Sequence, residues 1–276
     1  MSQSTARSGR VLTSDPAIEL RALQTHAEYA ACVQLQRDTW GMDYADCVPA
    51  SVLKVSQYVG GVSGGAFTGE GRLVGFVYGL TGVREGRLIH WSHMLAVAPE
   101  YRNHGVGRRL KEYQREVLRG LGVEMIYWTF DPLVARNAHL NLNRLGTRVE
   151  EYVPDMYGAT GSELHAFGTD RFVVSWAAAG GRQAAEAPGG WRGAGLPMGA
   201  AGNGKAGECA DEVVRIRIPV DVETLPIEEA QAWRSETRPQ FVALLADGYR
   251  VSGFVSDAAE GCYYVLSRGA GAAEAP

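Results

Sequence analysis

Apolar and polar residues alternate along the first two thirds of the chain with two different periods. A spacing of three to four residues predicts helices at about 25–40, 49–58, 106–121 and 133–145. Strand-like runs occur at about 64–68, 72–80, 88–97, 123–130, 148–153 and 171–176. Thr25 is expected to cap the first helix and Gly146 to end the last. This order predicts a mixed α/β architecture with helices packed on a central sheet.

The third predicted helix has the clearest amphipathic pattern. Its expected buried stripe consists of Val106, Leu110, Tyr113, Val117 and Leu121.

One segment departs from these patterns. Residues 177–208 contain ten Gly and ten Ala among 32 positions and predict a flexible linker or a mobile loop. It divides the chain into a disordered N-terminus at 1–15, a larger unit at 16–176, a smaller unit at 209–268 and a tail at 269–276. The smaller unit has a strand-helix-strand-strand pattern, and we expect it to pack on the larger unit and extend its sheet. Pro239 is expected to break or kink its helix.

Composition and charge narrow the functional classes. The 276 residues include 27 basic and 31 acidic side chains, and the net charge of −4 gives no reason to expect nucleic acid as a partner. Residues 1–15 are polar, and no apolar run approaches the roughly 18 residues of a membrane span. We therefore expect no signal peptide, no membrane partner and a cytoplasmic location. The four cysteines are scattered without a C-x-x-C pair, so no metal site is expected.

The sharpest chemical feature is a pair of glycines between a predicted strand and a predicted helix. Gly105 and Gly107 let the backbone approach an anion closely, and the exposed N–H groups of a helix N-terminus attract phosphate oxygens. Arg102 and Arg108 add positive charge at the same place. The G-x-x-x-x-G-K-[ST] loop is absent, and Leu110 replaces the third glycine of the dinucleotide motif G-x-G-x-x-G. A pyrophosphate group is therefore expected here.

The sequence Arg102-x-x-Gly105-x-Gly107, after the strand that ends in Leu95-Ala-Val97, resembles motif A of the GNAT superfamily of N-acetyltransferases. The resemblance covers about residues 20–176 and implies a GNAT fold, in which a central mixed, mostly antiparallel sheet is flanked by helices. It also implies acetyl-CoA or another acyl-CoA as co-substrate. The residues that it places at the cofactor are Leu95, Ala96 and Val97 beside the pantetheine arm, Arg102, Asn103, His104, Gly105, Val106, Gly107 and Arg108 at the pyrophosphate, and Asn137 near the arm.

A closer resemblance is to a sub-family of predicted GNAT acetyltransferases with a C-terminal extension. Some enzymes of the superfamily transfer succinyl groups to amino acids, so N-succinylation is one activity that the resemblance allows. The stretches that carry it include Ser92-His93-Met-Leu-Ala-Val97, Trp128-Thr-Phe-Asp131-Pro132, Arg136-Asn137-Ala138 and Thr169-Asp170-Arg171.

Acyl transfer to an amine needs a base, an oxyanion donor and an acid for the leaving thiolate. The resemblance assigns the oxyanion donor to a backbone N–H on the 95–97 strand. Many family members carry a Tyr on the last helix as the acid, but Leu142 stands at that place here. Tyr152 and Tyr157 are the candidate substitutes, and we favour Tyr157. The alternative for each is a packing role.

The candidate bases are His90 and His93. They lie three apart on a predicted strand and therefore point to opposite faces. If Leu95 and Val97 mark the cofactor face, His93 shares that face and is the preferred base. A hydrogen-bonded core histidine and a base that acts through ordered water are the alternatives.

Charged residues at the strand ends and on the last helix are candidate substrate contacts. Asp131 follows one predicted strand, and Asp170 can orient Arg171, whose guanidinium can bind a substrate carboxylate. Arg234 and Arg238 are four apart on the helix of the smaller unit and can bind an anionic substrate or the cofactor. A structural ion pair and a solvated helix face are the respective alternatives.

These residues together predict an acyl-CoA-dependent N-acyltransferase that acts on a small-molecule amine, with amino acids among the candidates. The alternative is a GNAT-like module that binds acyl-CoA without catalysis, as a sensor or scaffold, because the usual acid is missing. The oligomeric state is left open, with a homodimer as one arrangement.

Overall fold

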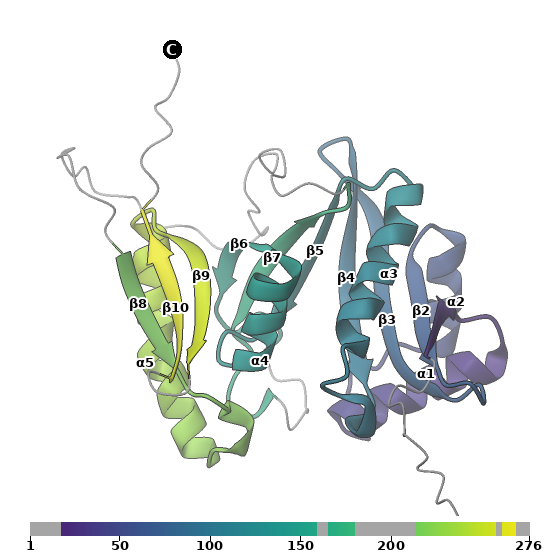
Figure 1. Cartoon of the computed structure of the whole chain (residues 1–276), viewed down its shortest axis with the longest axis horizontal. Coiled ribbons are helices and arrows are strands. Elements are labelled where there is room, and N and C mark those ends of the chain that lie inside the picture. The colour runs from purple at the N-terminus through teal and green to yellow at the C-terminus, as the bar shows by residue number, and fades with distance from the viewer. Residues whose placement is uncertain (1–17, 159–164, 180–212, 258–260, 269–276) are drawn as a thin grey trace, which may run out of the picture.

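The computed structural model describes residues 18–158, 165–179, 213–257 and 261–268 (Figure 1). The expected N-terminal segment 1–15, the tail 269–276 and all of the expected linker after residue 179 lie outside the described residues. In chain order the elements are β1 (Glu19–Ala22), α1 (His26–Trp40), α2 (Ala50–Tyr58), β2 (Val62–Phe67), β3 (Leu73–Arg84), β4 (Arg87–Val97), the 3-10 turn η1 (Pro99–Tyr101), α3 (Val106–Gly120), β5 (Met125–Phe130), α4 (Ala135–Ala138), the π-helix η2 (His139–Leu145), β6 (Arg148–Val153), β7 (Arg171–Ala177), β8 (Val213–Ile218), the 3-10 turn η4 (Val222–Thr224), α5 (Ile227–Ala246), β9 (Arg250–Asp257) and β10 (Gly261–Ser267).

The larger unit is built on a seven-stranded sheet in the order β1-β2-β3-β4-β5-β7-β6. Within the described sheet, β4 and β5 run parallel and all other neighbours run antiparallel. The expected mixed, mostly antiparallel sheet flanked by helices is thus confirmed. The sequence pattern misses β1, because its four residues, Glu-Leu-Arg-Ala, are too few to show an alternation.

Helices cover both faces of this sheet (Figure 1). α1 and α2 pack on one face, where Leu53, Phe76 and Tyr78 are buried. α1 begins where expected: the Thr25 hydroxyl accepts a hydrogen bond from the Glu28 N–H, and the Glu28 side chain closes the capping box. α3 packs on the opposite face. The burial of both faces explains why the central strands read as nearly continuous apolar runs.

The surface that α3 buries is partly polar. Lys111 Nζ donates to Ser92 Oγ at 2.7 Å and lies 3.8 Å from the centre of the Trp128 ring. Gln114 Nε2 lies 3.0 Å from His90 Nε2. Because α3 reaches both β4 and β5 through these contacts, it joins two strands that separate beneath it.

The expected apolar stripe of α3 faces the core along most of the helix. Val106 and Leu110 are buried, and Tyr113 and Val117 pack against the core. Leu121 is 48% exposed because α3 ends at Gly120, and Leu118 is buried in the last turn. The apolar pattern also misses Lys111 and Gln114, which are polar but buried.

The smaller unit has the expected strand-helix-strand-strand order, but it forms a sheet of its own. Its strands pair in the order β8-β10-β9, and none joins the larger sheet in the described chain, so the expected extension of that sheet is wrong. Aromatic side chains join the units: the ring of Phe241 lies 5.2 Å from Tyr152 and 5.0 Å from Phe172, and Tyr264 lies 5.3 Å from Phe172. α5 also continues through Pro239 to Ala246, so Pro239 does not break the helix. The helix tolerates the one missing N–H because it packs on the larger unit before and after this position.

Gly79 on β3 lies directly against a buried histidine. A Cβ atom at Gly79 would stand 2.2 Å from His90 Nε2 and 2.5 Å from the Trp91 carbonyl oxygen. We expect Gly79→Ala to lower the free energy of unfolding by roughly 2–3 kcal/mol in urea titrations, because the core must move to admit the methyl group. A Cβ at Gly82, on the same strand, would meet no atom within 4 Å, so Gly82→Ala is the matched control. Equal losses in the two variants would contradict this packing.

The buried His90 should make stability depend on pH. Burial, with the nearby charge of Lys111, lowers the pKa of His90 to about 3, whereas in the unfolded chain it is about 6.5. As pH falls below about 6.5, the unfolded chain takes up the proton first, so stability that is complete above that pH is progressively lost. The free energy of unfolding should fall by up to about 1.4 kcal/mol per pH unit between about pH 6.5 and 5. His90→Gln should reduce this slope without abolishing it, because His93 and His165 also have lowered pKa values. His26→Gln, at an exposed position, should leave the slope unchanged, and an unchanged slope in His90→Gln would exclude a contribution from His90.

Candidate active site

The larger sheet opens between β4 and β5. In the described sheet the two strands pair only from Ile89↔Met125 to Trp91↔Tyr127. Beyond this point they diverge (Figure 1), while β4 stays paired with β3 as far as Val97. The last half of β4 therefore presents an edge without a neighbouring strand. A free edge offers backbone N–H and C=O groups to an extended ligand.

A β-bulge lies at the point of divergence. β3 pairs Gly79 with Ser92 and Tyr78 with Met94, so His93 has no partner on that strand. The His93 ring packs edge-on against the Tyr78 ring, with 6.1 Å between their centroids. It therefore lies on the side of the sheet that α1 and α2 cover.

The bulge corrects the expected orientation of His93. Leu95 and Val97 face α3, because a Cβ added at Gly107 would lie 3.6 Å from Leu95 Cδ2 and 3.8 Å from Val97 Cγ2. His93 faces the other way, so the expectation that it shares their face is wrong: the extra residue of the bulge shifts the alternation by one. His90 and His93 do point to opposite faces, and both ring nitrogens of His90 have partners.

His93 combines solvent exposure with a desolvating environment. Its side chain is exposed, yet neighbouring protein lowers its pKa below the ordinary 6.5 by burial, an effect that the negative charge of Asp46 partly offsets. The imidazole is therefore mostly neutral at pH 7 and can accept a proton.

The glycine loop leaves the start of α3 open. Asn103 and Gly105 have positive φ angles of 64° and 75°, and the first backbone bond of the helix runs from the Arg109 N–H to the Gly105 carbonyl. The N–H groups of residues 106–108 have no backbone partner in the described chain. α3 also lacks a side-chain cap and an acidic residue in its first turn, unlike α1. Uncapped N–H groups and the helix dipole favour an anion at this end.

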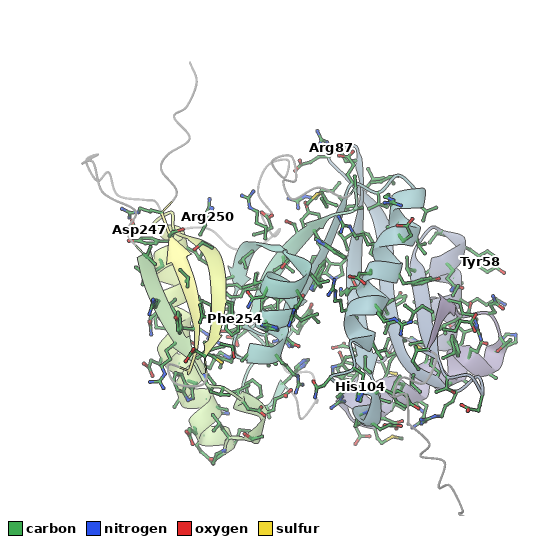
Figure 2. The ribbon with its side chains drawn as sticks, in the orientation of Figure 1. Tyr58, Arg87, His104, Asp247, Arg250 and Phe254 are labelled. Carbon is green, nitrogen blue, oxygen red and sulfur yellow. The ribbon has the colours of Figure 1, made fainter. Side chains whose placement is uncertain are left out.

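Two arginines of the loop are held by neighbouring groups. Arg102 Nε donates to the Val97 carbonyl at 3.0 Å, and Arg108 Nε pairs with Glu112 Oε1 at 2.8 Å. His104 is exposed at the lower end of the sheet, opposite the Arg87 end of β4 (Figure 2). Asn137, on α4 across the gap between β4 and β5, makes no side-chain hydrogen bond to the described residues.

The two candidate acids differ in their surroundings. Tyr157 is partly exposed, and its hydroxyl lies 2.9 Å from Thr129 Oγ1 near the end of β5. Tyr152 is buried, donates its hydroxyl proton to Asp170 Oδ2 and stacks on Phe241. Tyr152 therefore joins the two units, and Tyr157 is the one that remains accessible.

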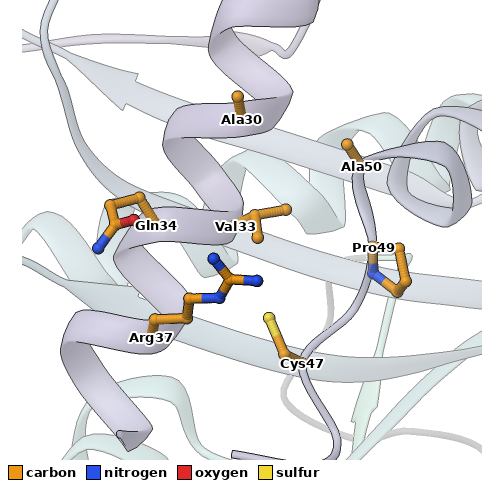
Figure 3. A pocket seen from close by; sticks show the side chains of 7 residues that line it. All are labelled: Ala30, Val33, Gln34, Arg37, Cys47, Pro49 and Ala50. Atoms are coloured by element: carbon orange, nitrogen blue, oxygen red, sulfur yellow. The ribbon is translucent and has the colours of Figure 1, made fainter. Parts of the chain in front are cut away.

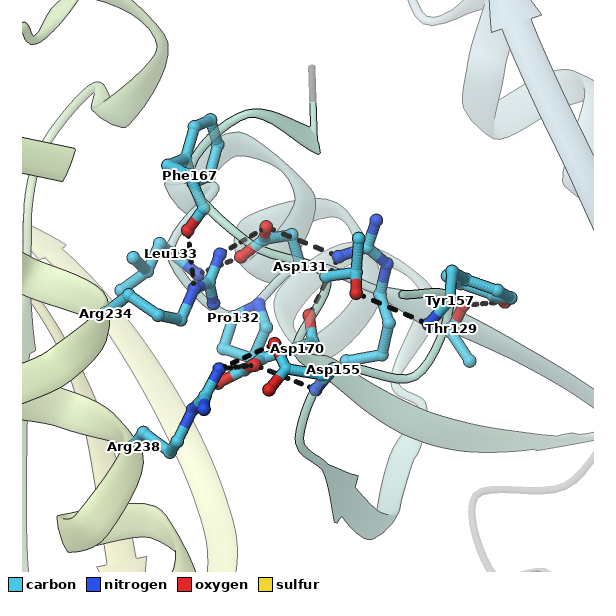
Figure 4. A network of polar contacts seen from close by, with 12 residues as sticks. Thr129, Asp131, Pro132, Leu133, Asp155, Tyr157, Phe167, Asp170, Arg234 and Arg238 are labelled. Carbon is cyan, nitrogen blue, oxygen red and sulfur yellow. Dashed lines mark hydrogen bonds and ion pairs between the residues drawn. The ribbon is translucent and has the colours of Figure 1, made fainter. Parts of the chain in front are cut away.

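Asp131, just after β5, organises a buried network of charges (Figure 4). Its Oδ1 accepts the Leu133 N–H at 2.9 Å, and its Oδ2 accepts Arg234 Nη2 at 2.6 Å and Arg171 Nη1 at 3.4 Å. Arg171 Nη1 also donates to the Asp170 carbonyl at 2.8 Å. The side chains of Asp131, Arg171 and Arg234 are only 9%, 8% and 5% exposed. Arg171 and Arg234 therefore share one carboxylate in a desolvated environment.

The Asp170 carboxylate has a different role from the expected one. It accepts Arg238 Nη2 at 2.6 Å, the Asp155 N–H at 3.0 Å and the Tyr152 hydroxyl. Although burial opposes ionisation, hydrogen bonds from Arg238 and Tyr152 hold the pKa of Asp170 below its ordinary value. Its backbone carbonyl, and not its carboxylate, contacts Arg171. Arg238 lies on the same helix face as Arg234, and each binds carboxylates of the larger unit.

Three residues near this network escape the sequence analysis. The rings of Tyr44 and His165 lie 6.4 Å apart, edge to face. Burial and the charge of Arg171 lower the pKa of His165 to about 4, and the charge of Asp46 acts on both His165 and His93. All three stand in connecting segments without periodicity, so no pattern indicates that they meet; the run of polar and aromatic residues at 43–46 is the one weak signal.

A separate groove of about 490 Å³ lies between α1 and the start of α2 (Figure 3). The residues that line it are Ala30, Val33, Gln34, Arg37, Cys47, Pro49 and Ala50. None of the expected site residues is among them. In the described part of the chain, no three His, Cys, Asp or Glu side chains are grouped to hold a metal ion, and no helix there is long and apolar enough to cross a membrane.

Residues 64–142 match the family model of the acetyltransferase (GNAT) domain. Solved structures that match the chain include the ribosomal-protein-S18-alanine N-acetyltransferase from Escherichia coli, with 18% identity over 59% of this chain and 96% of that chain and a TM-score of 0.45. An acetyltransferase of the GNAT family from Streptococcus pneumoniae has 15% identity over 58% and 99% of the chains and a TM-score of 0.47. An aminoglycoside 6'-N-acetyltransferase complexed with coenzyme A has 16% identity over 58% and 96% and a TM-score of 0.44. No curated protein matches the chain significantly.

The segment matched by the family model runs from β2 into the π-helix, and it contains the bulge, the free edge of β4 and the glycine loop. The chain therefore contains a segment, residues 64–142, that matches the GNAT acetyltransferase domain.

Proposed function

We propose that this protein transfers an acyl group from acyl-CoA to the amine of a small molecule, by direct attack of the amine in a ternary complex. Acetyl and succinyl are the candidate acyl groups, and amino acids are candidate acceptors. One observation carries the proposal: the free edge of β4 is followed in the chain, after η1 and the glycine loop, by the uncapped start of α3. An extended arm that ends in a pyrophosphate matches this pair of features.

The residues at this edge fit coenzyme A. The N–H groups of Val106, Gly107 and Arg108 would hold the pyrophosphate, with the exposed Arg102 and His104 beside it. The backbone of residues 95–97 would pair with the pantetheine arm, and Asn137 would contact the arm from the opposite side of the gap. Bound acyl-CoA would supply an activated thioester.

The chain's own groups have distinct roles in this reaction. His93, neutral at pH 7, would accept the proton of the attacking amine. A backbone N–H on β4 at residues 95–97 would stabilise the oxyanion. The Tyr157 hydroxyl, held by Thr129 at 2.9 Å, would give a proton to the leaving thiolate. The position of His93 at the bulge, and of Thr129 on β5, which diverges from β4 there, supports these assignments.

A non-catalytic acyl-CoA sensor is the second candidate. Leu142 favours it, because this apolar residue stands where many superfamily members carry a tyrosine acid, and here it packs against the core. Release of free thiol separates the two functions. Purified protein with acetyl-CoA or succinyl-CoA and a panel of amines should release thiol if it is an enzyme, whereas binding of CoA without any release would favour the sensor.

Gly107 gives a direct test of the CoA site. Gly107→Glu places a carboxylate at the start of α3, where it would repel phosphate and occupy its space, so CoA affinity measured by calorimetry should fall by at least about 100-fold. Gly120→Glu, at the far end of the same helix, where an added Cβ meets nothing within 4 Å, is the control and should keep wild-type affinity. Unchanged CoA binding in Gly107→Glu would refute this placement.

His93 gives a test of the base. We expect His93→Asn to lower kcat by about 10²–10³ with little change in the KM for acyl-CoA. Since burial lowers the pKa of His93 from 6.5, the imidazole becomes protonated only on the acid side of that value. The rate should therefore fall below about pH 6.5 in the wild type, and this acid limb should disappear in His93→Asn but persist in His26→Asn. An acid limb that survives in His93→Asn would point to another base, such as ordered water.

A further inference from the structure

We propose that Arg171 binds a carboxylate of the acceptor, so that the acceptor is an amino acid or another amine that carries a carboxylate. This inference rests on the proposed acyltransferase function and narrows it. The sequence offers Arg171 only as one of several candidates; the structure singles it out by the way its hydrogen bonds are distributed.

One edge of the Arg171 guanidinium is unused. Its Nη1 donates to the Asp170 carbonyl and, at 3.4 Å, to Asp131. Its Nε and Nη2 groups, which form the other edge, have no hydrogen-bond partner among the described residues. That edge presents two parallel N–H groups, the geometry that binds a carboxylate with two hydrogen bonds.

The unused edge is also reachable. In the described chain, the fully buried side-chain atoms that lack a partner are Gln114 Oε1, Glu151 Oε2 and Arg234 Nη1. No atom of Arg171 is among them, so its unpaired N–H groups touch solvent although the side chain is only 8% exposed. A ligand that displaces this solvent gains a charge-assisted bond with little desolvation of the arginine still to come.

The smaller unit keeps Arg171 available. Arg234 on α5 holds Asp131 Oδ2 at 2.6 Å, and the Leu133 N–H holds Oδ1. Both carboxylate oxygens of Asp131 therefore already accept a short hydrogen bond. Arg171 Nη1 is a more distant donor, at 3.4 Å from Asp131 Oδ2. Two guanidinium groups share this one carboxylate, so the Nε and Nη2 edge of Arg171 keeps no anionic partner among the described residues.

The surroundings suit a small zwitterion. The Tyr157 ring, with the proposed acid, lies 5.4 Å from the Arg171 guanidinium carbon. The charge of Arg171 also acts on His165 and Tyr44. Asp46 provides negative charge near His93, where the amine of the acceptor would be deprotonated. A carboxylate at Arg171 and an ammonium group near Asp46 match the two charges of an amino acid.

The first experiment needs no variant. Binding to the protein saturated with CoA is measured by calorimetry for the common D- and L-amino acids, their carboxamides and their decarboxylated amines. We expect at least one amino acid to bind about 10- to 1000-fold more tightly than its amide and its decarboxylated amine. Equal affinity within every set, or binding of amides alone, would overturn the proposal. Because binding is read directly, this result is independent of turnover.

Variants then assign the preference to Arg171. Arg171→Gln should remove the preference for the carboxylate, and Arg171→Lys should restore part of it, while CoA affinity stays at the wild-type value. Arg148→Gln, an exposed arginine on the strand beside β7, is the matched control and should keep the full preference. A preference that survives in folded Arg171→Gln would refute the assignment.

Arg234 is inferred to act as a positioning residue. Arg234→Met frees Asp131 to close on Arg171, so the KM for the acceptor should rise about tenfold or more while the KM for acyl-CoA stays unchanged. If the wild-type protein does not bind CoA, the proposed acyltransferase function itself is wrong. If it binds CoA but shows no preference for carboxylates, only the role of Arg171 is wrong.

Discussion

The separation of β4 from β5 is the constraint on which the rest of the structure depends. Two parallel strands that start together would normally continue to pair, because each further residue adds backbone hydrogen bonds. Here pairing stops after Trp91 and Tyr127, and Lys111 of α3 reaches into the opening, where it contacts Ser92 on β4 and Trp128 on β5. Trp128 is held in turn by Asn141 of the π-helix at 2.9 Å. A chain of side-chain contacts thus links the two halves of the sheet across the opening.

This opening has an energetic cost. The buried amine of Lys111 contacts a hydroxyl group and an indole ring. Its desolvation lowers the pKa of Lys111 well below the ordinary value. Gln114 Oε1 is buried without a partner beside His90, which is itself kept neutral. A purely apolar α3 would pack at lower cost. The directional contacts of Lys111 and Gln114 hold β4 and β5 at a fixed separation. Apolar side chains at these positions would not define that separation.

The sequence predicts the elements of the larger unit well, because capping, glycine termination and apolar runs are local signals. Thr25, Gly105 and Gly146 stand where the structure begins or ends helices. What it misses is long-range. The bulge at His93 depends on the register between two strands, so simple alternation assigns this residue to the wrong face. The separate sheet of the smaller unit likewise depends on an aromatic cluster that no local pattern reveals.

The candidate site divides in the same way. The glycine loop is a contiguous motif, so its residues can be recognised together. The charged network is assembled from positions far apart, and sequence reasoning can propose Asp131, Arg171, Arg234 and Arg238 as candidates but cannot say which pairs with which. The choice of carboxylate partner decides whether all N–H groups of an arginine are hydrogen-bonded or some remain free. These ion pairs form only when α5 packs against the larger unit.

The contact between Asp131 and Arg234 has a consequence for the order in which the protein is made. These residues are 103 positions apart, and the larger unit is synthesised in full before Arg234 leaves the ribosome. Until α5 docks, Asp131 has Arg171 as its nearest free counter-charge, and the two would close on each other. Docking of α5 therefore changes the main partner of Asp131 from a residue of the larger unit to Arg234. The charge pairing in the larger unit is thus completed by the part of the chain that is synthesised after it.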